Sequence, residues 1–508
     1  MNIKYNDIIE NDFILSNDSF KWIEFNKKID LLKSKYPNLL RKFTSFDGYA
    51  FPSREYVTKH TGLKKKTKLI QISNVNDTEW LVTEGQKFEF LPNTFLESKK
   101  RYLLNEDYVL ISLTGGSDLE KDISSYFDNS FQAFLNQRVS AFKSTINKDR
   151  DLYFYFYGFT KSLFFKEQWL GRGGIQKNTG AKERKNTYIP ELSNSKVIKY
   201  VSLLTQSIIN KEKLIRDRHD NILKLIDNEL INNQKPNSYS FKYPTFNELN
   251  DIGRMDTNLY REEFKKIDFS IKNYSNGFQS IFDLGFKLSR GQNLQVSNIG
   301  KSVYSNSYYE GFYTLMLPKH LSKYGTVHTK AFIGNGKELK TLKQGDLIFG
   351  AEGFEKGRSI VIVEEKDRTI TNIHGITIQQ KEKNLTKAIF VKCFLDYLRD
   401  NEIIDLFAVG GNGGSLAQKY WHYIPFPKFD ESKQKELAKL YYNPKTEINF
   451  DNATLENYLE LDNAFNEKAG IYELDKSAKE LKERLNEVID KIANDENIEI
   501  TFGEIANA

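Results

Sequence analysis

Four short motifs occur twice in this 508-residue chain, in the same order each time. The first copies are QISNV (71–75), DYVLI (107–111), Gly173-Gly174 and Tyr188-Ile189-Pro190. The second copies are QVSNI (295–299), DLIF (346–349), Gly413-Gly414 and Tyr423-Ile424-Pro425. One match of this length arises by chance, whereas four in one order indicate an internal repeat. The spacing between copies drifts, as it does where loops differ in length. We therefore expect two equivalent units in tandem.

Within each half, short runs of β-branched and aromatic residues alternate with Gly and Asn, which is typical of strands joined by turns. Examples are KLIQISNV (68–75), DYVLISL (107–113), RSIVIVEE (358–365) and HGITIQ (374–379). One apolar helical pattern comes late in each half, at 151–168 and at 386–402. Each half is thus predicted to be a mixed, strand-rich domain.

A different pattern follows each half. Residues 193–231 contain no Pro or Gly, and their apolar positions recur at helical spacing: Val197, Val201, Leu204, Ile208, Ile215, Ile222 and Leu225. A helix of this length spans about 58 Å. Lys211 and Arg218 interrupt its apolar seam. Near the C-terminus, after a shorter helical stretch at 430–442, a matching seam is formed by Leu474, Ala478, Leu481, Leu485, Val488 and Ile492.

The apolar seam of each helix must be buried against a partner, and each of the two helices can bury the seam of the other. The fold class we expect is α+β, with two tandem strand-rich domains joined by two long helices that form an antiparallel coiled coil. The alternative is a pair of separate amphipathic helices, each lying on its own domain.

The charge is distributed unevenly along the chain. The formal net charge is +6, yet residues 445–508 contain 16 Asp or Glu against 7 Lys or Arg, so the preceding body is strongly basic. Such a body is typical of a protein with a polyanionic partner, although a merely basic surface gives the same count. No stretch has the 18 or more apolar residues of a membrane span, and the N-terminus does not resemble a signal peptide. We expect a cytoplasmic protein in which the only cysteine, Cys393, is a buried apolar residue.

Several segments resemble the DNA-specificity subunits of type I restriction-modification systems, the HsdS family. The residues that carry the resemblance are RMDTNLY (254–260), similar to Arg-x-Asp-x-x-x-Tyr; QISNV and QVSNI; NQRV (136–139) ahead of an aromatic helix; and GGIQKNTGAKERKNTYIP (173–190) directly before the long helix. The likeness extends over nearly the whole chain. The first 60 or so residues lack an Arg-x-Asp-x-x-x-Tyr counterpart, and residues 444–472 interrupt the C-terminal helical region.

The resemblance implies a domain plan. Members of that family carry two target-recognition domains in tandem, each followed by a long helix, and the two helices pair as a spacer. We accordingly predict a first recognition domain at 1–192, a first spacer helix at 193–235, a second recognition domain at 236–427 and C-terminal spacer helices at 428–508.

Candidate DNA-binding residues come from the glycine-rich loops and from the segments around QISNV and QVSNI. Lys and Arg suit phosphates, whereas Asn, Gln, Ser and Arg suit base edges. In the first half the candidates are Lys64, Lys65, Lys66, Lys68, Ser73, Asn74, Arg172, Gln176, Lys177, Asn178, Lys182, Arg184 and Lys185. In the second half they are Arg290, Gln292, Asn293, Asn298, Asn412, Ser415 and Gln418. The alternative for each is an ordinary solvated loop or a turn-forming residue.

Catalytic patterns are weaker. Asp346, Glu364 and Lys366 have the order of a magnesium-dependent nuclease triad, but that order is common in charged sequences. No two prolines are adjacent, which excludes the Asn/Asp-Pro-Pro-Tyr signature of amino-methyltransferases, and GGNGG (410–414) lacks the Gly-Lys-Ser/Thr of a nucleotide-binding loop. The histidines show no metal-ligand spacing; they are His60, His219, His320, His328, His374 and His422.

The expected function is recognition of a bipartite double-stranded DNA target by a non-catalytic subunit. The resemblance implies two methyltransferase subunits and restriction (helicase-nuclease) subunits as partners, with S-adenosylmethionine, ATP and Mg²⁺ bound by those partners and no cofactor in this chain. The alternatives are a stand-alone metal-dependent endonuclease and a coiled-coil adaptor that binds protein only.

Overall fold

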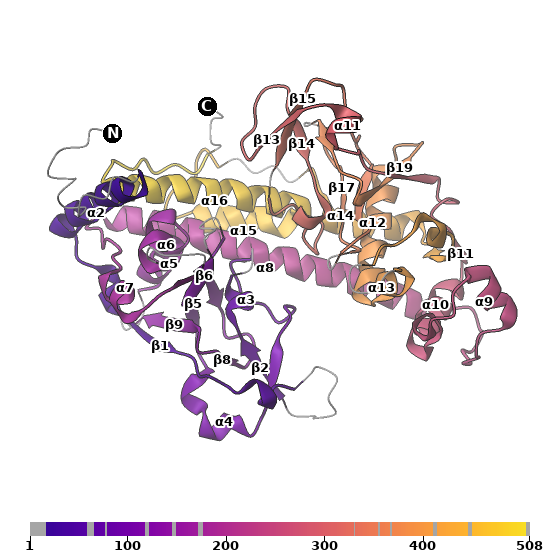
Figure 1. The fold of residues 1–508 in the computed structure, drawn as a ribbon, viewed down its shortest axis with the longest axis horizontal. Helices are drawn as coiled ribbons and strands as arrows, with labels where there is room; N and C mark the ends of the chain where they lie inside the picture. The colour runs from indigo at the N-terminus through magenta and orange to yellow at the C-terminus, as the bar shows by residue number, and fades with distance from the viewer. Residues whose placement is uncertain are drawn as a thin grey trace. The chain divides into compact units, whose positions relative to one another are not determined.

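The structure is a computed structural model, and it describes residues 17–57, 66–76, 79–116, 121–144, 149–170, 176–329, 331–353, 356–365, 368–409, 414–445 and 450–503. The chain divides into two compact units (Figure 1). Unit 1 comprises Met1–Lys213, Glu447–Glu467 and Lys476–Ala508, and unit 2 comprises Leu214–Thr446 and Lys468–Asp475. Among the described residues, no helix has the length and apolar character needed to cross a bilayer.

Unit 1 contains a main sheet, a side sheet and a short ribbon. The main sheet is antiparallel, with the order β1 (Phe43–Asp47), β9 (Val139–Ser144), β5 (Tyr108–Ser112), β7 (Ser124–Phe127). The side sheet has the order β3 (Glu89–Pro92), β2 (Lys66–Ile70), β8 (Ala133–Leu135), β4 (Leu103–Leu104), and its β2–β8 pair is parallel. The ribbon pairs β10 (Gln176–Asn178) with β6 (Thr114–Gly116).

Unit 2 contains the same two kinds of sheet. Its main sheet is antiparallel, with the order β12 (Phe286–Arg290), β19 (Gly375–Gln380), β16 (Leu347–Gly350), β17 (Ser359–Val361). Its side sheet has the order β13 (Ser302–Ser305), β15 (Phe332–Asn335), β14 (Tyr313–Leu315), β18 (Thr369–Ile370), and its β14–β18 pair is parallel. A further ribbon pairs β11 (Phe278–Gln279) with β20 (Phe426–Pro427).

Strand order relates the main sheets of the two units one to one. In chain order, β1, β5, β7 and β9 occupy the same places in their sheet as β12, β16, β17 and β19. The single parallel pair, β2–β8 or β14–β18, recurs with an antiparallel neighbour, β3 or β15, on its first strand. The predicted duplication and the α+β fold class are therefore confirmed, and DYVLI and DLIF lie on equivalent strands.

One of the four sequence matches is wrong as a structural equivalence. QISNV forms a one-turn helix, α3 (Ile72–Val75), directly after β2, whereas QVSNI forms α11 (Val296–Ile299) before β13 and β14. Because β2 corresponds to β14, the two helices occupy different places in the order of elements. Both copies adopt the same local turn without being counterparts. The strand expected across 68–75 ends at Ile70, where Gln71 caps the helix.

A capped helix follows the main sheet in each unit. Asp149 caps α5 (Arg150–Thr160) by accepting a hydrogen bond from the Leu152 amide, and Asn384 caps α12 (Leu385–Asp400) by accepting one from the Lys387 amide. The helix expected at 151–168 is divided in two, because α6 (Leu163–Leu170) begins after a break at 161–162. The helix expected at 386–402 is confirmed as α12, and a short helix, α13 (Ile403–Phe407), follows it.

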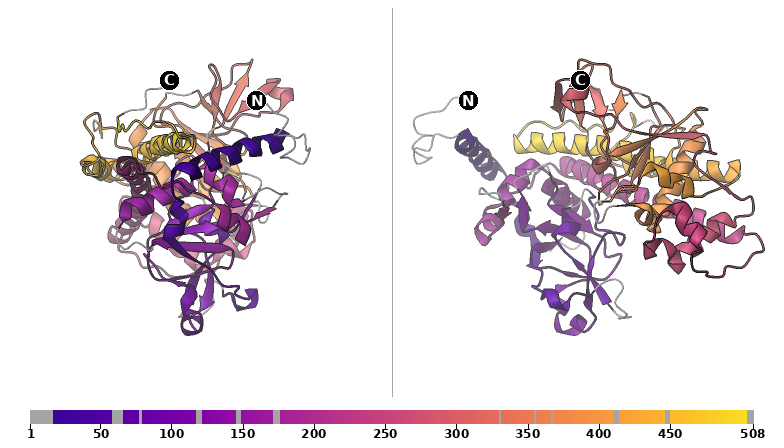
Figure 2. Two further views of the ribbon diagram at one scale, coloured as in Figure 1. Left: turned by 90° about the vertical axis from the view of Figure 1, so that its left-hand side faces the viewer. Right: turned by 45° about the vertical axis from the view of Figure 1, so that its right-hand side comes forward.

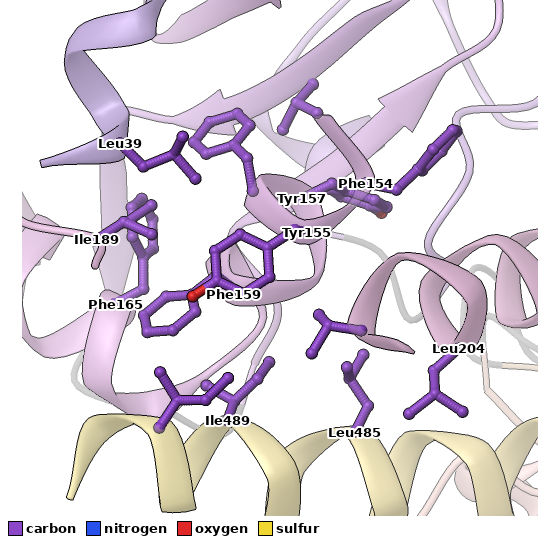
Figure 3. Close-up of a cluster of buried hydrophobic side chains, with 14 of the residues drawn as sticks. Leu39, Phe154, Tyr155, Tyr157, Phe159, Phe165, Ile189, Leu204, Leu485 and Ile489 are labelled. Carbon is purple, nitrogen blue, oxygen red and sulfur yellow. The ribbon is translucent and has the colours of Figure 1, made fainter. Parts of the chain in front are cut away.

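The core of unit 1 surrounds α5 (Figure 3). Nine of the eleven residues of α5 are buried, as expected for a helix that is apolar on all sides. Tyr155 and Phe159 lie among side chains of α6, α8 and α16, including Phe165, Leu485 and Ile489. Gly158 allows the close approach, since a Cβ there would collide with Thr205 of α8.

The two predicted long helices are present and lie side by side within unit 1 (Figures 1 and 2). α8 (Ser195–Asn232) is one continuous helix of 38 residues, and α16 (Ile471–Ala493) has 23. Tyr200 makes an edge-to-face contact with Phe502, which follows α16, whereas Glu212 further along α8 pairs with Lys482 at 2.5 Å. The contacts thus progress in opposite directions along the two segments, and the pairing is antiparallel as expected.

The predicted interruption at 444–472 contains a third helix, α15 (Tyr458–Lys468). It supplies the partners of Lys211, the residue that interrupts the seam of α8. The Lys211 ammonium donates to the Asp462 carboxylate at 2.6 Å and to the Asn466 side-chain oxygen at 2.7 Å, and all three side chains are buried. A buried charge with its hydrogen bonds satisfied is tolerated, and it fixes which positions face each other. The interruption is therefore an integral part of the helical layer.

Candidate nucleic-acid interface

The two units build the same corner where the first strand of the main sheet ends. Two residues past β1, Tyr49 forms a parallel bridge with Asn136, and two residues past β12, Gln292 forms a parallel bridge with Asn372. A glycine precedes each bridge. A Cβ at Gly48 would lie under 3.0 Å from the backbone oxygens of residues 135 and 136, and one at Gly291 would lie under 3.0 Å from that of Asn372. Glycine is therefore required at both corners for backbone to approach backbone.

The facing segment is also the same in both units. The Asn136 side chain accepts a hydrogen bond from the Arg138 amide at 3.1 Å, and the Asn372 side chain accepts one from the His374 amide at 3.2 Å. Each Asn closes a turn that exposes the next two residues, which are Gln137 and Arg138 in unit 1 and Ile373 and His374 in unit 2. The two corners thus have the same backbone contacts, whereas the side chains that they expose differ between the units.

The segments that follow the two glycine-rich loops contact the end of the central strand at this corner. The Thr179 amide donates to the Leu113 carbonyl at 2.8 Å in unit 1, and the Leu416 amide donates to the Ala351 carbonyl at 2.9 Å in unit 2. By this correspondence Asn178 and Ser415, both predicted as DNA-binding residues, occupy equivalent places. Asn178 is exposed and Ser415 is half-buried.

In unit 2 the corner holds a polar cluster that joins the two predicted segments. Arg290, at the end of β12, lies 2.9 Å from Glu352, and its guanidinium donates to the Ser415 hydroxyl at 3.4 Å and to the Ile373 carbonyl at 3.2 Å. His374 Nδ1 lies 2.8 Å from the other oxygen of Glu352. Burial alone would raise the pKa of Glu352, but the hydrogen bond with His374 and the charge of Arg290 outweigh it and lower that pKa.

In unit 1 the corresponding pair has the opposite arrangement. Asp47 ends β1 where Arg290 ends β12, and both of its oxygens accept from the Arg184 guanidinium, at 2.9 and 2.8 Å. Arg184 belongs to α7 (Ala181–Asn186), which follows the glycine-rich loop and also carries the exposed Lys182 and Lys185. The predicted basic loop thus places three cations beside the end of the main sheet.

A hollow of about 470 Å³ lies beside this helix. Its floor is aromatic, formed by Phe43, Phe142 and Trp169, and its rim is basic, with Arg41, Arg184 and Lys185 among its lining residues. The lining also includes the exposed Ser45 of β1. The hollow extends the positive surface of α7 along the edge strand of the sheet.

The candidates around QISNV lie on and after β2 of the side sheet, and Ile70 at the end of β2 accepts a hydrogen bond from the Asn136 amide of the corner at 3.0 Å. Lys68 pairs with Glu84 and lies over the Phe131 ring, 5.0 Å from its centroid, and Lys66 lies 5.1 Å from the Phe90 centroid. Ser73 is exposed. Asn74 is 3% exposed, accepts from the Gln71 amide at 2.9 Å and donates to the Lys87 carbonyl at 2.9 Å. Asn74 is a capping residue, so we leave it out of the interface proposed below.

The remaining candidates fall into two groups. Gln292, Asn293 and Asn298 are half-buried or exposed on the segment that leads to β13, and Gln418 is exposed at the start of the 3₁₀ helix Gln418–Tyr423. Asn293 accepts from the Gln295 amide at 3.1 Å, which makes it a turn residue as well. Lys64, Lys65, Arg172 and Asn412 lie outside the described residues, and for Gln176 and Lys177 only the backbone on β10 is described.

Sequence reasoning missed three side chains of the corner as candidates: Arg138, Glu352 and His374. NQRV contains Arg138, but its second-half counterpart is Asn372-Ile373-His374-Gly375, which shares only the Asn. Glu352 corresponds to Thr114, which has a different chemical character. A search for repeated motifs finds what two copies share, and these positions differ between the copies.

The RMDTNLY motif forms a closed turn in unit 2. Arg254 Nε lies 2.6 Å from Asp256, its Nη1 donates to the Phe407 carbonyl at 3.0 Å, and the Tyr260 hydroxyl donates to the Arg254 carbonyl at 2.8 Å. The spacing of the motif therefore serves to tie this segment to the end of α13. The same segment lines an open hollow of about 630 Å³ together with Asp405 and Val409.

The residues of the alternative nuclease triad have structural contacts. The Asp346 carboxylate is buried and accepts from the Lys343 amide at 2.9 Å and from Gln379 Nε2 at 2.8 Å. The Glu364 carboxylate raises the pKa of Tyr472, after the larger effect of burial. Lys366 lies outside the described residues. Within the described part of the chain, no group of three His, Cys, Asp or Glu side chains is placed to hold a metal ion.

Comparison with known proteins gives likenesses in solved structures alone. No family model matches the chain, and no curated protein matches it. The S subunit of the type I restriction-modification system from M. genitalium matches over 90% of this chain and 95% of its own, with 11% identity and a TM-score of 0.40. The HsdS subunit from Thermoanaerobacter tengcongensis matches over 89% and 97%, with 11% identity and a TM-score of 0.25. A chain from a study of complex assembly and conformational transition of the type I R-M system matches over 90% and 98%, with 11% identity and a TM-score of 0.25.

Proposed function

We propose that this chain is a DNA-specificity subunit of the type I restriction-modification class, in which each unit reads one part of a split target in double-stranded DNA. The observation that carries the proposal is the repeated corner: Gly48 and Gly291, Asn136 and Asn372, and Asn178 and Ser415 recur with the same backbone contacts. Two copies of one frame with different exposed side chains suit the reading of two different short sequences.

The chemistry of the corners supports duplex DNA as the ligand. Guanidinium groups bind guanine edges in a bidentate manner, amide and hydroxyl groups bind other base edges, and surrounding lysines bind phosphates. Arg290, Ser415 and His374 in unit 2, and Arg138, Asn178 and Arg184 in unit 1, supply the first kinds of group. Lys182 and Lys185 supply the second. The basic body of the chain favours association with any duplex.

The chain acts without catalysis of its own in this proposal. Its modification and restriction partners would bring the methyltransferase and helicase-nuclease activities, with S-adenosylmethionine, ATP and Mg²⁺ bound on those partners, in a cytoplasmic complex. The antiparallel helical layer would set the separation of the two half-sites, because protein geometry fixes half-site spacing. The segment boundaries predicted from the sequence, at 192, 235 and 427, belong to the same proposal.

The test is selection of bound duplexes from a random library by the purified chain, followed by binding measurements at several salt concentrations. We expect enrichment of two short blocks at a fixed spacing, and an affinity that falls steeply with salt. One continuous block, or none, would contradict two reading units. Incubation of the lone chain with S-adenosylmethionine and the selected duplex provides the second arm, since methylation without a partner would contradict a non-catalytic role.

A further inference from the structure

The hollow beside α7 has two walls, residues 38–47 and residues 181–191, which include β1 and α7 (Figure 1). Asn38 fastens one wall to the other. Its side-chain amide donates to the Thr187 carbonyl at 2.9 Å, and its side-chain oxygen accepts from the Ile189 amide at 3.2 Å. The hollow is therefore formed before a ligand enters it, and little ordering entropy would be lost when one binds.

The walls of the hollow carry an excess of positive charge. Residues 38–47 and 181–191 contain five Lys or Arg and three Asp or Glu. The described residues that line the hollow include Arg41, Arg184 and Lys185, and none of them is Asp or Glu. Two positive charges in excess thus lie on a surface that presents no acid. An anion is the ligand that such a surface attracts.

The three carboxylates of the walls already have partners. Their contacts are Asp47 with Arg184 at 2.8 Å, Glu191 with Lys42, and Glu183 with the Gly180 amide at 2.9 Å. Arg41 and Lys185 are exposed, and neither pairs with a carboxylate in the part of the chain that the structure describes. These two cations are therefore free to bind a ligand in the hollow.

The number of free cations indicates the kind of anion. A carboxylate would match only one of the two, whereas one phosphate monoester, or two successive backbone phosphates of DNA, carries about two negative charges. Guanidinium and ammonium groups both donate to phosphate oxygens, and the exposed Ser45 adds a hydroxyl to the lining. The aromatic floor lowers the local dielectric constant, which strengthens the attraction between the charges. The volume of about 470 Å³ lies within the range of roughly 300–1,000 Å³ that small-ligand pockets have.

We propose that the hollow beside α7 is a phosphate site, in which Arg41 and Lys185 hold two successive backbone phosphates of a DNA strand or the phosphate group of a free nucleotide. Arg184 lines the hollow and also pairs with Asp47 at the corner of unit 1, so the site is continuous with the proposed interface. This continuity favours DNA as the source of the phosphates, and in that form the inference rests on the proposed function. The contact then positions the strand beside the unit 1 half-site without reading a base.

The test variant is the full-length chain with Arg41→Gln and Lys185→Gln, which removes both free cations from the hollow. The matched control carries Arg54→Gln and Lys196→Gln, because both residues are exposed, belong to unit 1 and do not line the hollow. The control loses the same net charge, so it separates a phosphate site from the general attraction between a basic protein and DNA. Circular dichroism checks that both variants are folded.

The first arm measures binding to the selected split target by fluorescence anisotropy, with pairs of neighbouring phosphates replaced in turn by neutral methylphosphonates. We expect one pair beside the unit 1 block to lower the affinity of the wild type and of the control roughly tenfold, and to leave that of the test variant unchanged. Every other pair should affect the three proteins equally. The fall of log affinity with log salt should be shallower by about 2 in the test variant than in the control.

The second arm titrates each protein with adenosine monophosphate by calorimetry, and with adenosine as the ligand that lacks the phosphate. If the site serves a free nucleotide, the wild type and the control bind the monophosphate alone with a Kd of about 1 mM or below, and the test variant does not. The site is wrong if the test variant matches the control in both arms, and a split target bound by the wild type then keeps the proposed function. If the wild type binds no duplex, the proposed function is wrong and the second arm alone decides the site.

Discussion

The corner of unit 1 and the corner of unit 2 share a backbone and differ in charge. In unit 1 a carboxylate, Asp47, ends the first strand and a guanidinium, Arg184, reaches it from a helix that follows the glycine-rich loop. In unit 2 the guanidinium of Arg290 ends the first strand, and the carboxylate of Glu352 reaches it from the loop after β16. Backbone contacts and one glycine maintain each corner, so its exposed side chains are free to differ. Under the proposed function, this difference lets one frame serve two specificities.

The largest effect on stability should come from substitution of the two corner glycines. Gly48→Ala and Gly291→Ala each force a Cβ against a backbone oxygen that cannot move away easily, so each should lower the free energy of unfolding by about 3 kcal/mol. Urea denaturation followed by circular dichroism measures it. Gly336→Ala is the control, because a Cβ there meets no atom within 4 Å. A mild effect at one corner alone would break the equivalence of the two units.

A smaller effect is expected from carboxylates that pair with lysines inside each unit, Asp122 in unit 1 and Asp396 in unit 2. Asp122 lies 3.3 Å from both Lys161 and Lys166 in unit 1, and Asp396 lies 2.6 Å from Lys392 in unit 2. Burial would raise the pKa of Asp396, but the charges of Lys392 and Arg399 outweigh it and lower the pKa from 3.8 to about 2. A lowered pKa stabilises the fold above pH 4, and this contribution is lost as the pH falls toward 2.

For Asp396 the loss should amount to about 2 kcal/mol between pH 4 and pH 2, which urea unfolding at a series of pH values measures. Asp396→Asn should be less stable at neutral pH, because Lys392 would lose its partner, and its stability should change less over this interval. The lowered pKa of Asp122 predicts acid sensitivity in unit 1 as well. An Asp396→Asn variant that keeps the full acid dependence would show that other groups cause it.

The third effect concerns reading of the target. Arg184→Ala and Arg290→Ala should each weaken binding by about 1.5 kcal/mol on the preferred duplex, and each should relax selectivity in a different block of the split target. Library selection with each variant measures the change. If both variants relax the same block, the assignment of one corner to one half-site is wrong.

The smallest effect should come from the acids that hold these arginines. Asp47→Asn and Glu352→Gln remove a negative charge near the proposed phosphate contacts, so affinity for non-specific duplex should rise about threefold at low salt, and the gain should fade as salt is added. Anisotropy titrations with an unrelated duplex measure it. A fall in affinity for either variant would indicate that the carboxylate accepts a hydrogen bond from a base.

Much of the fold follows from patterns that depend on neighbouring residues. The long helix, its antiparallel partner and the strands at 108–112 and 347–350 are set by local periodicity, and the sequence predicts them. Contacts between residues that are far apart in the sequence are harder to predict from it. Lys211 looks like a defect in the α8 seam until Asp462, 251 residues away, is placed beside it. QISNV and QVSNI resemble each other because each forms a capped helical turn. Their likeness reflects this local structure, and it does not mean that the two segments occupy equivalent places in the two units.

The candidate site was predictable in its scaffold and less so in its contacts. The segments after the glycine-rich loops lie at the end of the main sheet, and Arg290 donates to Ser415 there. The Asp47–Arg184 pair joins residues 137 apart, and neither residue belongs to a repeated motif. Glu352 and His374 were missed because the repeated motifs do not include the positions at which the two corners differ. Lys66 and Lys68 read as a free basic run, whereas the structure places them against phenylalanine rings.

Cys393 lies in the middle of α12 with no exposed surface, and burial raises the pKa of its thiol to about 12. At neutral pH this thiol is therefore protonated and shielded from alkylating reagents. A maleimide dye would leave the native chain unlabelled. Cysteines introduced at the exposed Leu31 and the exposed Tyr243, one in each unit and neither in the proposed interface, would then be the only sites to take a fluorophore pair. Single-molecule energy transfer between the two dyes would compare the separation of the units with and without the selected duplex.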